Sequence, residues 1–108
     1  MEDTIRALYE VVRGRKAHPQ EGSYTCYLFD QGLDKILKKC GEECSEVIIA
    51  AKNKNQEETA GEISDLLYHL TVLMVNEGIE LEAVEAVLAE RSRKIGNLKT
   101  FHVSDHNT

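Results

Sequence analysis

The segment 57–76 is apolar around most of its circumference, and this constrains the fold more than any other feature of the sequence. A helix of this kind must be covered on most of its sides, so it is expected at the centre of a structure. One helical partner in a chain of 108 residues cannot cover it. We therefore predict a homo-oligomer, a homodimer by default or a higher assembly. The apolar residues of the segment are Ile63, Leu66, Leu67, Leu70, Val72, Leu73, Met74 and Val75.

The remainder of the chain is also patterned for helices. Hydrophobic residues recur at intervals of three and four, and no stretch alternates polar and apolar residues as a half-buried strand would. The predicted fold class is all-α: a small helical bundle of four to five helices, assembled as a homo-oligomer through its largely apolar central helix. The predicted helices cover residues 1–15, 24–30, 34–54, 57–76 and 81–94.

The breaks between these helices come from glycine and proline. The segment 14–23 contains the single proline, Pro19, and is predicted to be a loop. Gly78 is expected to end the central helix. The length allows one domain, which we assign to residues 1–99, followed by a polar tail over residues 100–108.

Charge and cysteine content limit the classes of function. The formal net charge of −6 argues against a nucleic-acid partner, because a nucleic-acid binder presents a basic face. No apolar run is long enough to span a bilayer and no signal peptide is visible, so we expect a cytoplasmic protein with no membrane partner. The three cysteines form no CxxC pair, and we expect buried, reduced thiols rather than a zinc site.

Two acidic motifs lie on the two longest predicted helices. Each has carboxylates three residues apart, Glu43 and Glu46 in the first and Glu62 and Asp65 in the second. This spacing puts both acids of a pair on one helical face. If the helices pack side by side, the acids converge, and two unit charges about 4 Å apart repel by roughly 4 kcal/mol at an effective dielectric of about 20. Protons or a divalent cation would offset this repulsion, and carboxylate ligands favour Mg²⁺, with Mn²⁺ possible.

The simpler interpretation is that these acids are solvated and paired with lysines, as charges on a helix usually are. Glu42 fits that interpretation best, because it points nearly opposite the apolar stripe. His69, four residues after Asp65, suits either a supporting partner of a metal ligand or a surface histidine hydrogen-bonded to that acid. We interpret Tyr24 and Tyr68 as core aromatics rather than base-stacking residues.

Several basic and hydroxyl side chains are candidates for binding phosphate. The best of the basic candidates are Lys39, Arg91 and Lys94. Ser23 could donate a hydrogen bond to a phosphate, or could simply cap the helix that follows it.

Three segments carry a resemblance to a known family. The sequences SYT at 23–25, KKCGEECSE at 38–46 and EISDLLYHL at 62–70 resemble the phosphoribosyl-ATP pyrophosphohydrolase family. That family is part of the all-α, MazG-like nucleotide pyrophosphohydrolase superfamily, whose shared signature is ExxE followed by ExxD. The likeness covers about residues 4–94.

The resemblance implies a site, an ion and a reaction. It implies that Glu43, Glu46, Glu62 and Asp65 bind Mg²⁺ and are the catalytic acids, with Glu42 joining through a second ion or a water. The implied reaction is hydrolysis of the α–β phosphoanhydride of phosphoribosyl-ATP, a small nucleotide, to phosphoribosyl-AMP and pyrophosphate. This is the second step of histidine biosynthesis.

Two alternatives stay open. The first is another enzyme of the same superfamily that hydrolyses dCTP or non-standard nucleoside triphosphates, since its acidic motifs would be the same. The second is a non-enzymatic helical oligomerisation module, which would explain the apolar central helix but not the acids.

Overall fold

The computed structural model describes residues 2–97, and the predicted polar tail at 100–108 lies outside them. The described residues form five helices and no strand, so the all-α prediction is confirmed. No helix among them is both long and apolar enough to cross a bilayer. The helices are α1 (Glu2–Ala17), α2 (Tyr24–Gln31), α3 (Leu33–Lys52), α4 (Gln56–Glu77) and α5 (Leu81–Asn97).

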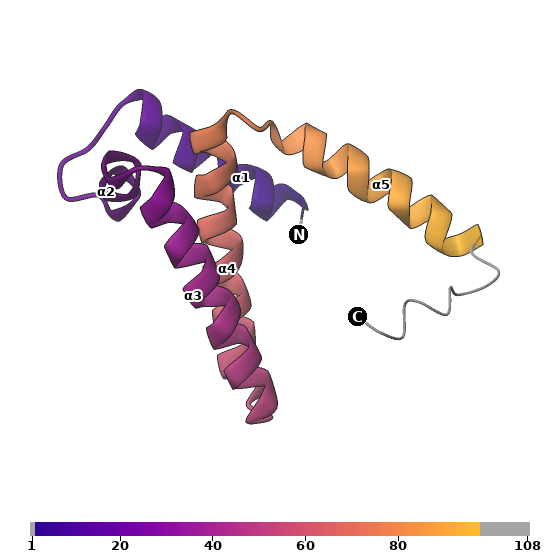
Figure 1. Cartoon of the computed structure of the whole chain (residues 1–108). Helices are drawn as coiled ribbons and strands as arrows, with labels where there is room; N and C mark the ends of the chain where they lie inside the picture. The colour runs from indigo at the N-terminus through magenta and orange to yellow at the C-terminus, as the bar shows by residue number, and fades with distance from the viewer. Residues whose placement is uncertain (1, 98–108) are drawn as a thin grey trace.

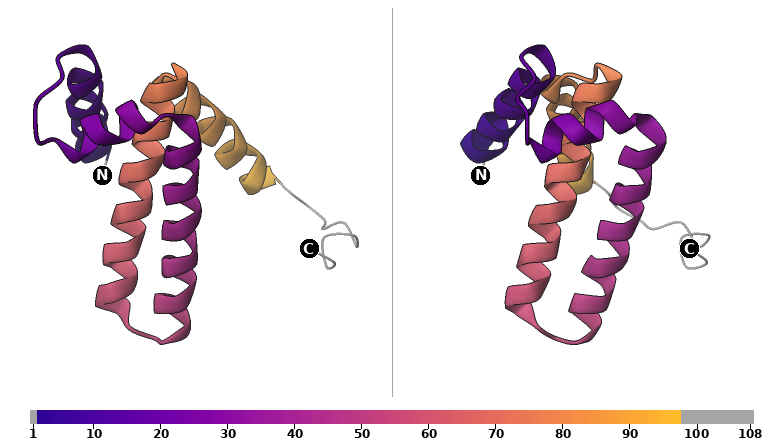
Figure 2. Two further views of the ribbon diagram at one scale, coloured as in Figure 1. Left: turned by 60° about the vertical axis from the view of Figure 1, so that its left-hand side comes forward. Right: turned by 90° about the vertical axis from the view of Figure 1, so that its left-hand side faces the viewer.

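Helices α3 and α4 form a long antiparallel hairpin, the main feature of the fold (Figures 1 and 2). Only residues 53–55 connect them. Lys54 takes a left-handed conformation with φ of 60°, and the Asn55 side chain accepts a hydrogen bond from the Glu58 backbone N–H at 2.9 Å. Asn55 thereby caps α4, whose first N–H groups have no partner inside the helix. The short connection fixes the turn and hence which residues of the two helices face each other.

The hydrophobic core lies at the end of the hairpin far from this loop, where α1 and α2 pack against it (Figure 2). Leu28 of α2, Ile36 of α3 and Val72 of α4 are completely buried there. The other end of the hairpin has no such cover. Ile48 and Ile49 of α3 are 63% and 59% exposed, and Ile63 of α4 is 43% exposed. One copy of the chain therefore covers only part of the apolar surface of its hairpin.

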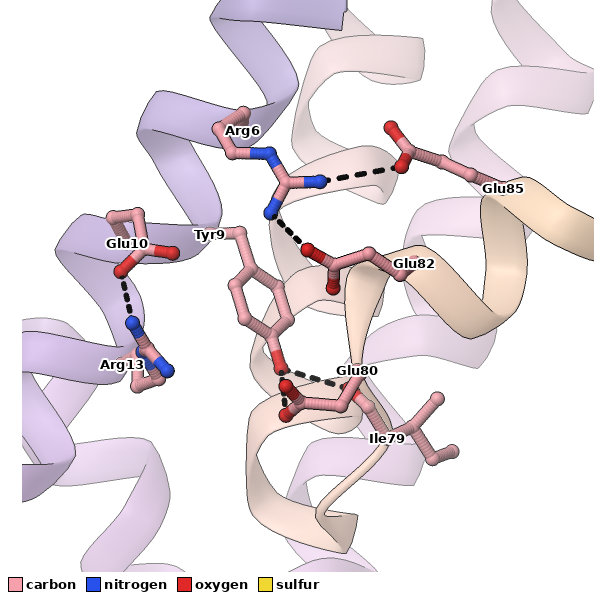
Figure 3. A network of polar contacts seen from close by, with 8 residues as sticks. All are labelled: Arg6, Tyr9, Glu10, Arg13, Ile79, Glu80, Glu82 and Glu85. Atoms are coloured by element: carbon pink, nitrogen blue, oxygen red, sulfur yellow. Dashed lines mark hydrogen bonds and ion pairs between the residues drawn. The ribbon is translucent and has the colours of Figure 1, made fainter.

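Helix α5 leaves the hairpin and is tied to α1 near its first turn (Figure 3). Gly78 ends α4 as predicted, in a left-handed conformation with φ of 72°. The Tyr9 hydroxyl then donates a hydrogen bond to the backbone oxygen of Ile79 at 2.8 Å. Arg6 forms ion pairs with Glu82 at 2.9 Å and Glu85 at 3.2 Å. Beyond these contacts α5 extends away from the hairpin (Figure 1).

Two local predictions are wrong. The predicted loop begins too early, because α1 continues through Gly14 to Ala17. A glycine inside a helix costs only about 1 kcal/mol, and the stronger break is Pro19, which disfavours helical backbone at His18 before it. The three cysteines are free, but only Cys40 is buried, while Cys26 is half-buried and Cys44 is exposed.

Candidate active site

The hairpin brings the two predicted acidic motifs together. Glu46 and Glu62 are equally far along the chain from Lys54, and so are Glu43 and Asp65. Folding the chain back at residues 53–55 therefore sets the motifs side by side. Glu43, Glu62 and Asp65 each place a carboxylate oxygen within 4.8 Å of the others. Glu43 is buried, Glu62 half-buried and Asp65 exposed, so the cluster opens from the hairpin seam towards solvent.

Two oxygens of this cluster are buried without a hydrogen-bond partner. They are Oε1 of Glu43 and Oε1 of Glu62. A buried carboxylate oxygen that loses water and gains no partner is strongly destabilising. A divalent cation would satisfy both oxygens, and three carboxylates are a donor set that suits Mg²⁺ or Mn²⁺. The side chains present therefore fit a hard divalent ion.

Glu46 joins the same group of acids through Glu62. A hydrogen bond with Glu46 is the largest cause that raises the pKa of Glu62, to about 7. Burial and the negative charges of Glu46, Asp65 and Glu43 raise the Glu62 pKa further. Without a cation, Glu62 therefore keeps a proton to a higher pH than an ordinary glutamate does. The repulsion expected from the sequence is present, and a proton relieves part of it.

Lys39 lies at the edge of the cluster and links it to Glu42. Its Nζ is 3.2 Å from Glu42 Oε1 and 3.9 Å from Glu43 Oε2. The hydrogen bond between Lys39 and Glu42 raises the pKa of Lys39 and lowers the pKa of Glu42. Glu42 is exposed and is not one of the three converging acids. This position matches its interpretation as a lysine-paired surface acid, and its role as an additional metal ligand stays a prediction.

The other predicted phosphate-binding residues lie elsewhere in the chain. Ser23 caps α2, where its hydroxyl oxygen accepts a hydrogen bond from the Cys26 backbone N–H at 3.2 Å. Arg91 and Lys94 are exposed on α5, and Lys94 Nζ lies 3.9 Å from Glu90. The helix that carries these two residues, α5, extends away from the hairpin that carries the acids (Figure 1). Their contact with substrate stays a prediction.

One polar connection next to the cluster was not predicted from the sequence. His69 is buried and its Nδ1 lies 2.8 Å from the backbone oxygen of Asp65, not from its carboxylate. The other ring nitrogen, Nε2, lies 3.1 Å from the Tyr24 hydroxyl. The spacing of four residues between Asp65 and His69 was a usable signal. The contact with Tyr24 depends on how α2 packs and has no signal in the sequence.

An antiparallel helical hairpin that gathers acids around buried, unpartnered oxygens defines a class of protein: an all-α protein with a carboxylate site suited to a divalent cation. The chain belongs to the phosphoribosyl-ATP pyrophosphohydrolase family, whose model matches residues 5–92. This assignment agrees with the resemblance seen in the motifs.

Curated relatives are similar over nearly the whole chain. A protein of Clostridium botulinum (strain Kyoto / Type A2) named phosphoribosyl-ATP pyrophosphatase is 56% identical over 97 residues, which cover 90% of this chain and 88% of the relative. A protein of Streptococcus sanguinis with the same name is 52% identical over 102 residues, covering 94% of this chain and 98% of the relative. A third protein with this name, from Streptococcus gordonii, is 57% identical over 90 residues, which cover 83% of this chain and 86% of the relative.

Proposed function

We propose that this chain is a cytoplasmic phosphoribosyl-ATP pyrophosphohydrolase of histidine biosynthesis that uses Mg²⁺, with Mn²⁺ as a possible substitute. It hydrolyses the α–β phosphoanhydride of phosphoribosyl-ATP and releases phosphoribosyl-AMP and pyrophosphate. The observation that carries the proposal is the group of acids on α3 and α4, which holds two buried oxygens without a partner in a chain of this family. A simple oligomerisation module would have no use for such a costly arrangement.

Glu43, Glu46, Glu62 and Asp65 would hold the ion. When bound, Mg²⁺ supplies neutralisation of phosphate charge and a fixed orientation for the leaving pyrophosphate. One carboxylate of the group accepts the proton of the attacking water, whose oxygen bonds to phosphorus as the phosphoanhydride P–O bond breaks. Lys39 keeps a positive charge at the edge of the cluster, where negative charge develops on the phosphate oxygens.

The active form we propose is a homodimer. Its interface would cover the exposed isoleucines near the 53–55 loop, and Leu88 of α5, which is 62% exposed. Isolated exposed apolar residues are normal on a protein surface, but large aliphatic side chains gathered on one hairpin favour a partner surface. A second copy is also the simplest source for the basic residues Arg91 and Lys94, which lie far from the acids within one copy.

The proposal is tested by measuring pyrophosphate release from phosphoribosyl-ATP with Mg²⁺, beside a panel of nucleoside triphosphates that includes dCTP. We expect phosphoribosyl-ATP to be hydrolysed with the highest kcat/KM, and Glu43→Gln to remove the activity. Preferential hydrolysis of dCTP or of a non-standard triphosphate would identify a different member of the superfamily. No hydrolysis of any of them would leave only the oligomerisation module.

A further inference from the structure

Two hydrogen bonds connect α2 to the backbone of the acidic cluster through His69. Its Nδ1 lies 2.8 Å from the Asp65 carbonyl oxygen, and its Nε2 lies 3.1 Å from the Tyr24 hydroxyl. A carbonyl oxygen can only accept, so Nδ1 carries the proton of the neutral ring and Nε2 is an acceptor. The Tyr24 hydroxyl must then donate. The two contacts together define one tautomer of His69.

The surroundings of His69 hold it in place. The side chain is buried, with 6% of its surface exposed. The ring of Tyr68 meets it edge-on with centroids 4.9 Å apart, and the ring of Tyr24 does so at 5.8 Å. The hydroxyls of Thr25 and Tyr68 are hydrogen-bonded to each other. The first turn of α2 is thus attached to α4 by two side-chain hydrogen bonds, immediately after the turn that carries Asp65.

Tyr24 is also within electrostatic reach of the acidic cluster. Burial is the largest cause that raises its pKa, while the positive charge of Lys39 acts to lower it and the charges of Tyr68 and Glu43 add to the rise. Tyr24 is 45% exposed, so it lies at the surface and its interpretation as a core aromatic is wrong. The connection therefore runs from the protein surface, through a buried imidazole, to the main chain of one acid of the cluster.

We propose that His69 is a positioning residue for phosphoanhydride hydrolysis, which holds the helical turn of Asp65 against the first turn of α2, and that Tyr24 keeps His69 in the tautomer that does this. The inference rests on the proposed function for its effect on turnover. Its physical basis is that the accepting carbonyl belongs to Asp65 itself. Any shift of the imidazole is therefore passed to the backbone from which the Asp65 carboxylate projects.

The kinetic test compares Tyr24→Phe, His69→Phe and the double variant with saturating Mg²⁺. Each single variant is expected to lower kcat by about 10- to 100-fold with little change in KM, the range typical of partners that orient metal ligands. The double variant should be no slower than His69→Phe, because both changes interrupt one connection. His69→Asn places an amide N–H near the position of Nδ1, where it can donate to the Asp65 carbonyl oxygen, and should recover part of kcat.

Tyr27→Phe is the matched control, because Tyr27 is a neighbouring tyrosine on α2 with its ring centroid 6.0 Å from that of Tyr24. Its hydroxyl makes no hydrogen bond with any described residue, and the variant should keep the wild-type kcat. Losses in kcat that multiply in the double variant, or a wild-type kcat for Tyr24→Phe, would overturn the proposal. Tyr24→Phe keeps the aromatic ring and removes only an oxygen, so it tests the proposal even if His69→Phe does not fold.

A second readout does not depend on activity. Imidazole ¹⁵N shifts of the metal-free protein at pH 8 should show His69 with its proton on Nδ1 and with Nε2 as a hydrogen-bonded acceptor. Tyr24→Phe should move the Nε2 signal, whereas Tyr27→Phe should not. A proton on Nε2 in the wild type would contradict the connection. If the wild type does not hydrolyse phosphoribosyl-ATP, the proposed function fails, while these shifts still decide whether Tyr24 and His69 are paired as described.

Discussion

Glu62 of α4 and Glu46 of α3 lie close enough to share a proton, and this contact is the largest cause that raises the Glu62 pKa to about 7. Two acids on facing helices have thereby become one coupled site whose charge changes near neutral pH. The repulsion among the clustered carboxylates favours the binding of a proton, and for the same reason it favours the binding of a divalent cation. Proton binding and cation binding at this site therefore compete.

The stability of the metal-free chain should respond to pH through Glu62. The folded pKa of about 7 lies above the ordinary value of 4.5, so the folded chain binds the proton more tightly than the unfolded chain. The stabilising contribution is complete below about pH 4.5 and is lost as pH rises through about 7. Glu62→Gln, which mimics the neutral acid, should therefore gain Tm relative to wild type between pH 5 and pH 8 in EDTA.

Glu42→Gln is the control for this experiment, because the hydrogen bond with Lys39 lowers the pKa of Glu42. Its contribution to stability is fully present above about pH 4.5 and is lost only as pH falls below that value, so the Tm of this variant should lie below the wild-type Tm by a constant amount between pH 5 and pH 8. A Tm difference for Glu62→Gln that shrinks between pH 5 and pH 8 would contradict the position assigned to Glu62.

Addition of Mg²⁺ should stabilise the folded chain in a saturable way. An ion that binds only the folded state at about 100 times its Kd adds about 2.7 kcal/mol to the free energy of unfolding. Thermal denaturation across a Mg²⁺ titration measures this effect, with NaCl at equal ionic strength as the reference. Glu43→Gln and Asp65→Asn should lose most of the Tm increase, and Glu57→Gln, at an exposed position of α4 outside the cluster, should keep it. An equal Tm increase in all three variants would show that the ion acts by general screening.

Glu46→Gln or Asp65→Asn should abolish pyrophosphate release while leaving the helical content unchanged. Each substitution removes one negative charge from the cluster and hardly alters the shape of the side chain, so the helices have no reason to unfold. Coupled measurement of pyrophosphate release and far-UV circular dichroism separates these effects. Near-normal turnover by either variant would contradict the assignment of these acids to the active site.

Ile48→Glu should shift the proposed homodimer to a monomer. The side chain is 63% exposed in one copy, so a charge there costs little in the monomer and much in a buried interface. Sedimentation velocity at several concentrations reports the mass. Thr4→Glu adds the same charge at an exposed position of α1 and should leave the dimer intact. An unchanged mass for Ile48→Glu would remove this surface from the proposed interface.

The attachment of α5 should depend more on Tyr9 than on Arg6. Tyr9 is buried and its hydroxyl donates to Ile79, so Tyr9→Phe should cost about 1 kcal/mol of the free energy of unfolding. The Arg6 ion pairs are partly exposed, and Arg6→Gln should cost less than about 1 kcal/mol and less still at high salt. Urea denaturation measures both values. A larger cost for Arg6→Gln would contradict this order.

The helices and the acidic pairs could be predicted because both follow from spacing along one helix. The interval of three residues between Glu43 and Glu46 settles the face on which they lie before any tertiary contact is known. The end of α1 was predicted too early because Gly14 was taken as a helix break, although a single glycine costs too little to end a helix. The partnership of Tyr24 with His69 was beyond the sequence, because it depends on the position of α2 across α4. The distance of Arg91 from the acids likewise follows from the direction of α5.

The turn at residues 53–55 restricts how this chain can change. None of its side chains reaches the acids, yet Lys54 is the midpoint about which Glu46 opposes Glu62 and Glu43 opposes Asp65. Inserting one residue there would keep every acid in the sequence. Glu46 would then face Glu62, and Glu43 would face Asp65, only if one of the two helices rotated by about 100°. An insertion of the kind that surface turns usually tolerate should therefore abolish the activity of this enzyme without unfolding it.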